Sequence, residues 1–81
     1  MKTIEVKDRQ TFRTFVEILR EQFSEDNQNW ENATLDSFLV ALGRYTDDIQ
    51  GYYDNTNQNV NADIPSWKVF ADILTGAAIY E

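Results

Sequence analysis

The side chains best suited to chemistry in this chain are carboxylates and tyrosines gathered within residues 47–54. Neighbouring carboxylates can share a proton or hold a divalent cation, and tyrosines beside acids make good anchors for a protein partner. The simpler interpretation is a solvated surface at the end of a helix, where acids are slightly unfavourable with the helix dipole. The group consists of Asp47, Asp48, Tyr52, Tyr53 and Asp54.

The amino-acid composition excludes most other kinds of catalytic or metal-binding site. The chain contains no cysteine and no histidine, so it has no thiol nucleophile, no Cys/His zinc site and no serine–histidine triad. Residues 54–65 begin like a calcium loop, but Asn59 stands where that loop needs Gly and Pro65 where it needs Glu. A working pair of carboxylates needs a cleft that 81 residues rarely build. We therefore expect a protein that is not an enzyme and holds no cofactor or metal ion.

Charge is distributed unevenly along the chain. The net charge is −7, with +2 in residues 1–20 and −9 in residues 21–81. This acidity argues against direct binding of nucleic acid, which requires a basic surface. Two interpretations remain open. Either the cations of the first helix pair with acids on the other elements, or the acidic surface is kept for a basic partner.

Signals for a membrane or for secretion are missing from the sequence. No apolar run approaches the roughly 20 residues that span a bilayer. No leader with a basic start and an apolar middle opens the chain. We therefore expect a cytoplasmic protein that makes no membrane contact.

The first of three predicted helices covers residues 9–23, with Asp8 as its N-cap. Its apolar residues recur at the spacing of a helix, which places them on one stripe. A short extended segment, residues 1–7, is predicted in front of it because Ile4 and Val6 alternate with charged residues. The stripe consists of Phe12, Phe15, Val16, Leu19 and Phe23.

The second predicted helix covers residues 33–50, with Asn32 as its N-cap and Gly51 as a left-handed C-terminal cap. Gly43 lies inside it, where glycine costs about 1 kcal/mol relative to alanine, and we expect it to allow a close approach of another helix. The apolar stripe consists of Leu35, Phe38, Leu39, Leu42, Tyr45 and Ile49.

A long asparagine-rich loop, residues 52–64, is predicted to lead into a third helix over residues 65–80 that starts at Pro65. The sequence therefore predicts a mainly α fold in which three amphipathic helices surround an aromatic core, forming one small helical domain over residues 1–81. The stripe of the third helix is rich in small residues and consists of Trp67, Phe70, Ala71, Leu74, Ala77 and Ala78.

Two stretches resemble a family of small acidic bacterial proteins of unknown function. They are the pattern W-E-N-x-x-L from Trp30 to Leu35 and the pattern P-S-W-x-x-F-A-x-I-L-x-x-A-x-x-Y-E from Pro65 to Glu81. The resemblance implies a one-domain protein and no catalysis. A weaker resemblance, from Asn32 to Asp36, is to barstar, an acidic inhibitor of a basic ribonuclease. Barstar has a parallel sheet whose C-terminal strands are missing here, so neither its fold nor its inhibitory residues carry over.

These observations predict a non-enzymatic protein-binding module, either an immunity- or antitoxin-like inhibitor or a phage-type decoy of a basic target. Asp47, Asp48 and Asp54 would pair with lysine or arginine of the partner, and Tyr52 and Tyr53 would anchor the contact. The alternative is a structural protein that forms a homodimer, through the small residues of the third helix or through exposed tyrosine and tryptophan.

Overall fold

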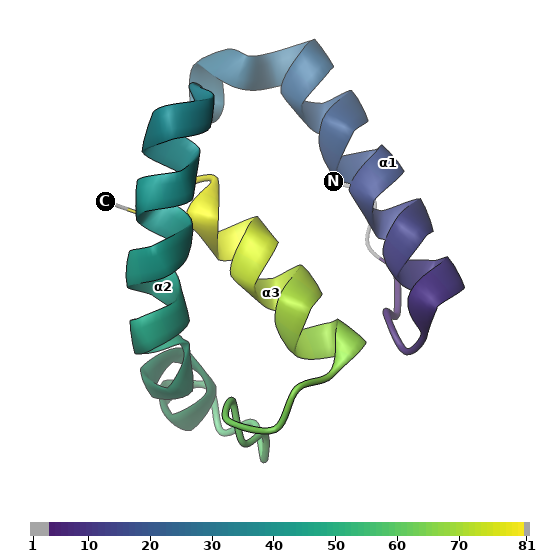
Figure 1. Ribbon diagram of the computed structural model, residues 1–81, viewed down its shortest axis with the longest axis vertical. Helices are drawn as coiled ribbons and strands as arrows, with labels where there is room; N and C mark the ends of the chain where they lie inside the picture. Colours follow the sequence, from purple (N-terminus) through teal and green to yellow (C-terminus); the bar gives the residue numbers. More distant parts are fainter. Residues whose placement is uncertain (1–3, 81) are drawn as a thin grey trace.

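Three helices make up the molecule, and α3 joins the other two (Figure 1). The computed structural model describes residues 4–80, apart from the side chain of Asn27. Its elements are α1 (Arg9–Asp26), a short 3₁₀ turn η1 (Asn27–Asn29), α2 (Leu35–Asn55) and α3 (Trp67–Ala77). α3 packs against both long helices, while α1 and α2 stay apart and approach each other only where η1 and the following segment connect them. The mainly α prediction is confirmed, since residues 4–80 contain no strand.

α1 begins as its sequence predicts and ends later. The Thr11 N–H donates to Oδ1 of Asp8 at 2.8 Å, which makes Asp8 the N-cap. Hydrogen bonds from Thr11 lower the pKa of the Asp8 carboxyl group. The helix runs to Asp26, three residues past the predicted end, and η1 follows. Residues 4–7 have no regular structure, although Val6 is buried, and the rest of the predicted extended segment lies outside the described residues.

Both predicted ends of α2 are wrong. The N-cap is Thr34, because Thr34 and Ser37 exchange side-chain and backbone hydrogen bonds in a capping box. At the other end the helix continues through Gly51 to Asn55, and Asn57, not Gly51, takes the left-handed conformation at φ 56°. Asparagine tolerates that conformation better than most residues, so the helix had no need to stop at the glycine.

α3 is shorter than predicted at both ends. Ser66 is the N-cap, accepting from the Val69 N–H at 3.1 Å, so Pro65 lies outside the helix. The chain leaves the helix after Ala77, and the N–H of Tyr80 donates to the Gly76 carbonyl at 2.9 Å. Gly76 makes room for Tyr45 of α2, because a β-carbon there would overlap the ring of Tyr45. Gly43 has open space around it, so its predicted role in a close approach was wrong.

The centre of the fold is small and is made of aliphatic residues and one tyrosine. Most aromatic rings are only half-buried and surround this centre in contacting pairs, such as Phe12 with Trp67 at 5.3 Å between ring centroids. The small residues Ala71 and Ala77 of α3 are buried between the helices of one chain. None of the described helices has both the length and the apolar character needed to cross a membrane. The fully buried apolar residues are Val6, Ala41, Ile49, Tyr53, Val69, Ala71, Ala77 and Ala78.

Candidate functional site

The five predicted site residues all lie in the last turns of α2, but the helix separates them. Each residue advances the position by about 100° around a helix, so residues four or seven apart share a side and neighbours do not. Asp48 and Tyr52 therefore share one flank of α2, and Asp47 and Asp54 share another. Tyr53 points inward and is 0% exposed, so it cannot contact a partner in this fold. Tyr52 remains 44% exposed.

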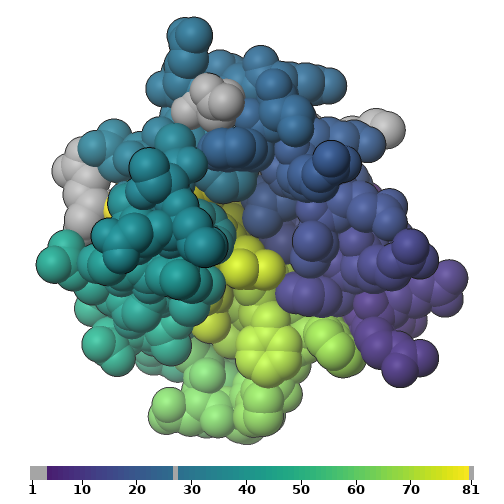
Figure 2. Space-filling model, turned by 45° about the horizontal axis from the view of Figure 1, so that its top comes forward, coloured from purple at the N-terminus to yellow at the C-terminus, as the bar shows by residue number. Residues whose placement is uncertain are grey.

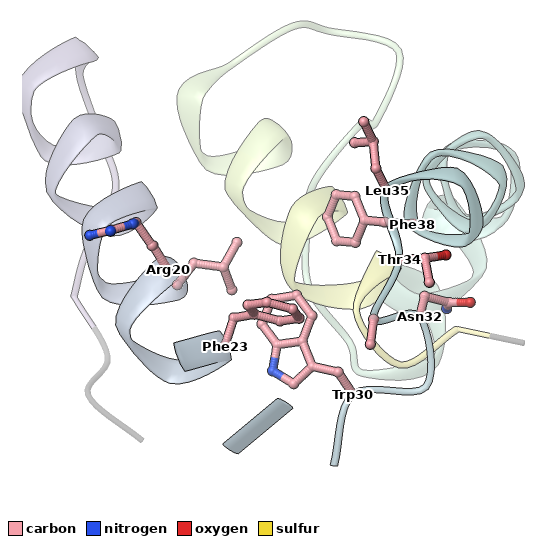
Figure 3. A pocket seen from close by; sticks show the side chains of 9 residues that line it. Arg20, Phe23, Trp30, Asn32, Thr34, Leu35 and Phe38 are labelled. Atoms are coloured by element: carbon pink, nitrogen blue, oxygen red, sulfur yellow. The ribbon is translucent and has the colours of Figure 1, made fainter. Parts of the chain in front are cut away.

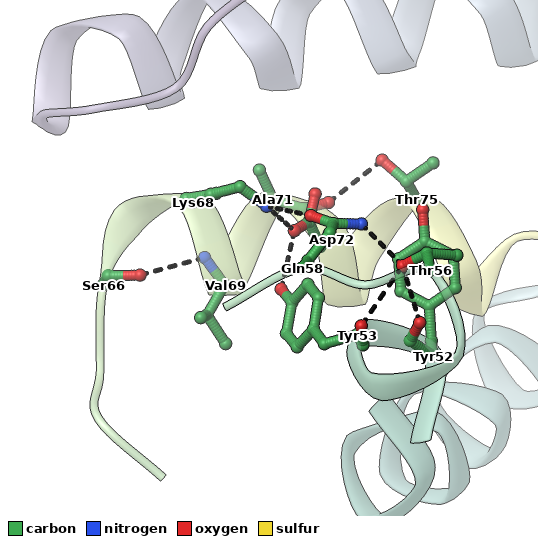
Figure 4. A network of polar contacts seen from close by, with 10 residues as sticks. All are labelled: Tyr52, Tyr53, Thr56, Gln58, Ser66, Lys68, Val69, Ala71, Asp72 and Thr75. Carbon is green, nitrogen blue, oxygen red and sulfur yellow. Dashed lines mark hydrogen bonds and ion pairs between the residues drawn. The ribbon is translucent and has the colours of Figure 1, made fainter. Parts of the chain in front are cut away.

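Tyr53 belongs to a polar network that fastens α2 to α3 (Figure 4). Its hydroxyl donates to Oδ2 of Asp72 at 2.6 Å, and Nζ of Lys68 lies 2.6 Å from the same oxygen. The Lys68 ammonium also lies 5.0 Å from the centre of the Tyr53 ring. Burial raises the pKa of the Tyr53 hydroxyl, and the hydrogen bond to Asp72 raises it further. The network fastens the two helices together, while the side chains of Lys68 and Asp72 stay 48% and 31% exposed.

Asp48 holds the end of the chain. The Tyr80 hydroxyl donates to its Oδ2, and the rings of Tyr45 and Tyr80 lie 5.1 Å apart between centroids. Asp48 is nevertheless exposed. This carboxylate therefore has a structural contact and can also meet a partner.

Asp47 and Asp54 form the more open pair of carboxylates. Both are exposed. Asp54 accepts a hydrogen bond from Nε2 of Gln50 at 3.1 Å. Gln50 also binds the Val60 carbonyl and the Ala62 N–H, at 2.9 and 2.8 Å, and so fixes the loop after α2 against this flank. Asp47, Asp48, Tyr52 and Asp54, which we call the acidic end of α2, are thus carried on a rigid helix.

Ion pairs within the described residues stay inside single helices. Arg13 pairs with Glu17 in α1 at 3.5 Å, and Lys68 pairs with Asp72 in α3 at 2.6 Å. No ion pair between residues 4 and 80 joins the cations of α1 to the acids of α2. The interpretation in which α1 neutralises the other elements is therefore wrong for this part of the chain. Within its observed bounds α1 carries three arginines and four acids, so the helix itself has a net charge of −1.

Asn32, the predicted N-cap of α2, instead binds the end of α3. Its side-chain Nδ2 donates to the carbonyls of Ala77 and Tyr80, at 3.0 and 2.5 Å, and its own N–H donates to the Ala78 carbonyl at 3.0 Å. The last carbonyls of a helix have no hydrogen-bond donor within the helix, and Asn32 provides donors for them. The sequence gives no sign of this contact, because its partners are more than 40 residues away.

A pocket that the sequence did not predict lies between α1 and the start of α2 (Figure 3). Its volume is about 350 Å³, and its walls are mostly apolar. Leu35 is 75% exposed and Leu39 is 55% exposed, although both belong to the apolar stripe of α2. The pocket is lined by Leu19, Arg20, Phe23, Trp30, Asn32, Ala33, Thr34, Leu35 and Phe38.

Helix length explains why this stripe is uncovered. At about 1.5 Å per residue, the 21-residue α2 is about 31 Å long and the 11-residue α3 only about 16 Å. α3 reaches Tyr53 through Asp72 and Tyr45 through Gly76, so it covers the later part of α2. The first turns of α2 extend past it. The sequence contains little sign of this mismatch, because the predicted apolar stripes, residues 35–49 and 67–78, are nearly equal in length.

Residues 8–81 match a family of unknown function, DUF7660. The match covers almost the whole chain and confirms the predicted membership of a family without known activity. The chain belongs to DUF7660. Neither the comparison with curated proteins nor the comparison with solved structures gave a match.

The described part of this DUF7660 chain offers surfaces for binding in two places. Between residues 4 and 80, no three acidic side chains come together as a metal site would require. The acidic end of α2 presents carboxylates and a half-exposed tyrosine, and the pocket at its other end presents apolar walls, with the Arg20 guanidinium pointing away from it (Figure 3).

Proposed function

We propose that this chain is a non-enzymatic protein-binding module that binds a basic protein through the acidic end of α2. Asp47, Asp48 and Asp54 pair with lysine or arginine of the partner, and Tyr52 anchors the contact. In the finer form of the proposal, the chain is an immunity- or antitoxin-like inhibitor, or a phage-type decoy, that masks a basic site on its target.

The observation that supports this proposal is that Asp47, Asp48 and Asp54 take part in no ion pair within the described residues. In the described residues the cations of α1 do not pair with the acids of α2, so α2 keeps its negative surface. An unneutralised acidic surface speeds the encounter with a basic partner and makes binding sensitive to salt. Had α1 neutralised α2, the net charge of −7 would have been a matter of solubility alone.

The rigidity of the acidic end also supports the proposal. Asp54 is held by Gln50, and the same Gln50 fixes the loop beyond the helix. Asp48 contacts Tyr80. Because these groups are ordered before binding, a partner orders few side chains when it docks. Tyr52 adds a large ring with a polar tip at 44% exposure, which is the type of residue that contributes most at interfaces.

A capture experiment tests this function. The wild-type chain, a double variant Asp47→Asn with Asp54→Asn, and a control Glu21→Gln with Glu25→Gln are immobilised and exposed to lysate of the native host. The control removes the same charge from exposed positions of α1. We expect a basic protein to bind the wild type and the control at physiological salt and to be lost at high salt. Its affinity for the double variant is expected to fall by about tenfold, which is about 1.4 kcal/mol.

Two results would contradict the proposal. One is equal capture of the same protein by the wild type and by the Asp47/Asp54 variant. The other is capture that is no weaker at high salt, since an interface built on exposed charges must weaken when they are screened.

A further inference from the structure

A third place for binding is a second pocket, which lies where the end of α1, η1 and the end of α3 meet. Figure 2 shows α3 at the surface between the separated α1 and α2. The second pocket has a volume of about 470 Å³, within the range of sites that bind small molecules. Its apolar walls are formed by Leu19, Trp30, Ala78 and Ile79. An apolar group can pack here, and the polar residues beside these walls decide which class of molecule carries it.

The charged side chains that line the second pocket are both negative. They belong to Glu25 and Asp26, and in the described residues neither takes part in an ion pair. α1 and α3 both end here, where the helix dipole adds partial negative charge, and neither has a basic residue in its last turn. Residues 21–43 and 69–81, which hold every lining residue except Leu19, contain no lysine or arginine. The second pocket therefore attracts a cation.

The same wall of the second pocket holds a hydrogen-bond donor without an acceptor. Nε2 of Gln22 is buried and has no partner in the described residues, which costs stability. Gln22, Glu25 and Asp26 are three and four residues apart, so they share one side of α1. The Gln22 side chain is only half-buried, so it can rotate to direct this N–H toward a molecule in the pocket. Opposite, the Thr75 hydroxyl donates to the Ala71 carbonyl at 3.0 Å, which leaves its oxygen able to accept.

We propose that the second pocket binds a small organic cation, made of an ammonium group on an apolar body with an oxygen acceptor close to the ammonium. The ammonium group faces Glu25 and Asp26, and the acceptor receives the hydrogen of the Gln22 amide. The apolar body packs against Trp30, whose ring also attracts the cation. The ligand thereby supplies both the counter-charge and the acceptor that the chain itself does not provide.

Other occupants fit this lining less well. An anion would be repelled by two carboxylates and two helix ends, and an uncharged molecule would leave the carboxylates without a counter-charge. A metal ion needs more oxygen ligands, and between residues 4 and 80 no three acidic side chains come together. The side chains of lysine and arginine in a protein partner carry a cation but no acceptor for Gln22. The acidic end of α2 contributes no residue to the second pocket, so this inference and the proposed function can fail separately.

Isothermal titration calorimetry of the wild-type chain with three probes tests the chemistry of the ligand. L-Phenylalaninamide has the ammonium group, the acceptor and an apolar ring. Phenethylamine lacks the acceptor, and N-acetyl-L-phenylalaninamide lacks the charge. We expect phenylalaninamide to bind with a Kd of about 1 mM or below, and the other two probes to bind at least about fivefold more weakly.

Two variants test the place of binding. Glu25→Gln with Asp26→Asn should weaken the binding of phenylalaninamide by about tenfold or more. The control Asp47→Asn with Asp54→Asn removes the same charge at the acidic end of α2 and should leave the affinity unchanged. Both pairs of positions are exposed, so these variants should fold.

Gln22→Leu tests the unpaired donor. Because it removes a buried N–H without an acceptor, it should raise the temperature of unfolding of the ligand-free chain. It should also lower the affinity for phenylalaninamide to that for phenethylamine, whose own affinity should not change. The proposal is overturned if phenylalaninamide fails to bind, if its neutral acetylated form binds equally well, or if the Glu25/Asp26 variant binds it as tightly as the wild type.

Discussion

Replacing Asn32 with Asp is expected to lower the free energy of unfolding by about 3 kcal/mol, because each buried group left without a partner costs about 1–3 kcal/mol. The wild-type amide donates to the carbonyls of Ala77 and Tyr80. A carboxylate cannot donate, and it places negative charge against two carbonyl oxygens. Urea denaturation followed by circular dichroism measures the change.

The matched control for this variant is Asn59→Asp, the same exchange at an exposed position in the loop between α2 and α3. It should change stability by less than about 0.5 kcal/mol, as is usual for surface substitutions. The penalty of Asn32→Asp should also shrink in acid, where the protonated carboxyl group can donate one hydrogen bond. Equal stability of the two variants at neutral pH would show that Asn32 does not fasten the end of α3.

The second large effect is expected at Tyr53, where Tyr53→Phe should cost about 2 kcal/mol, the usual size for a hydrogen bond to a charged group. The variant keeps the buried ring and loses the hydroxyl that donates to Asp72 at 2.6 Å. Lys68 remains beside Asp72, so the carboxylate is not left alone. The control Tyr52→Phe removes a hydroxyl from a ring that is 44% exposed and should cost little.

Tyr53 also predicts how stability depends on alkaline pH. Burial, followed by the bond to Asp72, raises the pKa of its hydroxyl in the folded state. The unfolded chain loses this proton near pH 10, the ordinary value for tyrosine, while the folded chain keeps it. Stability from Tyr53 is therefore complete below pH 10 and is lost as the pH rises above it. The loss should be smaller in Tyr53→Phe, and an identical loss in both proteins would contradict the buried hydrogen bond.

The helices could be predicted from the sequence because their signals are local. A helix can be recognised from apolar residues that recur within two turns, and each of the three predicted apolar stripes lies in a helix of the structure. The helix ends were harder, since several polar residues compete to cap the same turn. Asn32 and Thr34 are both suitable N-cap residues for α2. Thr34 caps the helix, because the side chain of Asn32 instead donates to a carbonyl at the end of α3. Gly51 did not stop α2 because nothing in the fold required a turn there.

The candidate site was only partly predictable. Asp47, Asp48, Tyr52 and Asp54 lie at the surface as expected, but Tyr53 is buried because the helix continues past Gly51 and rotates that position inward. The pocket exists because α3 covers only part of α2. No local sequence pattern predicts how far one helix extends along another. Leu35 and Leu39 belong to the stripe assigned to the core, and only the shortness of α3 reveals that they are uncovered.

Salt dependence tests the claim on which the proposed function rests, that α1 does not neutralise the acids of α2 within one chain. The free energy of unfolding is measured as NaCl is raised from 0.01 to 0.15 M, which shortens the range of electrostatic forces from about 30 to about 8 Å. We expect stability to rise, because salt screens the self-repulsion of a chain with a net charge of −7. A fall in stability would contradict the claim, since it would reveal attractive pairs between the helices that salt weakens.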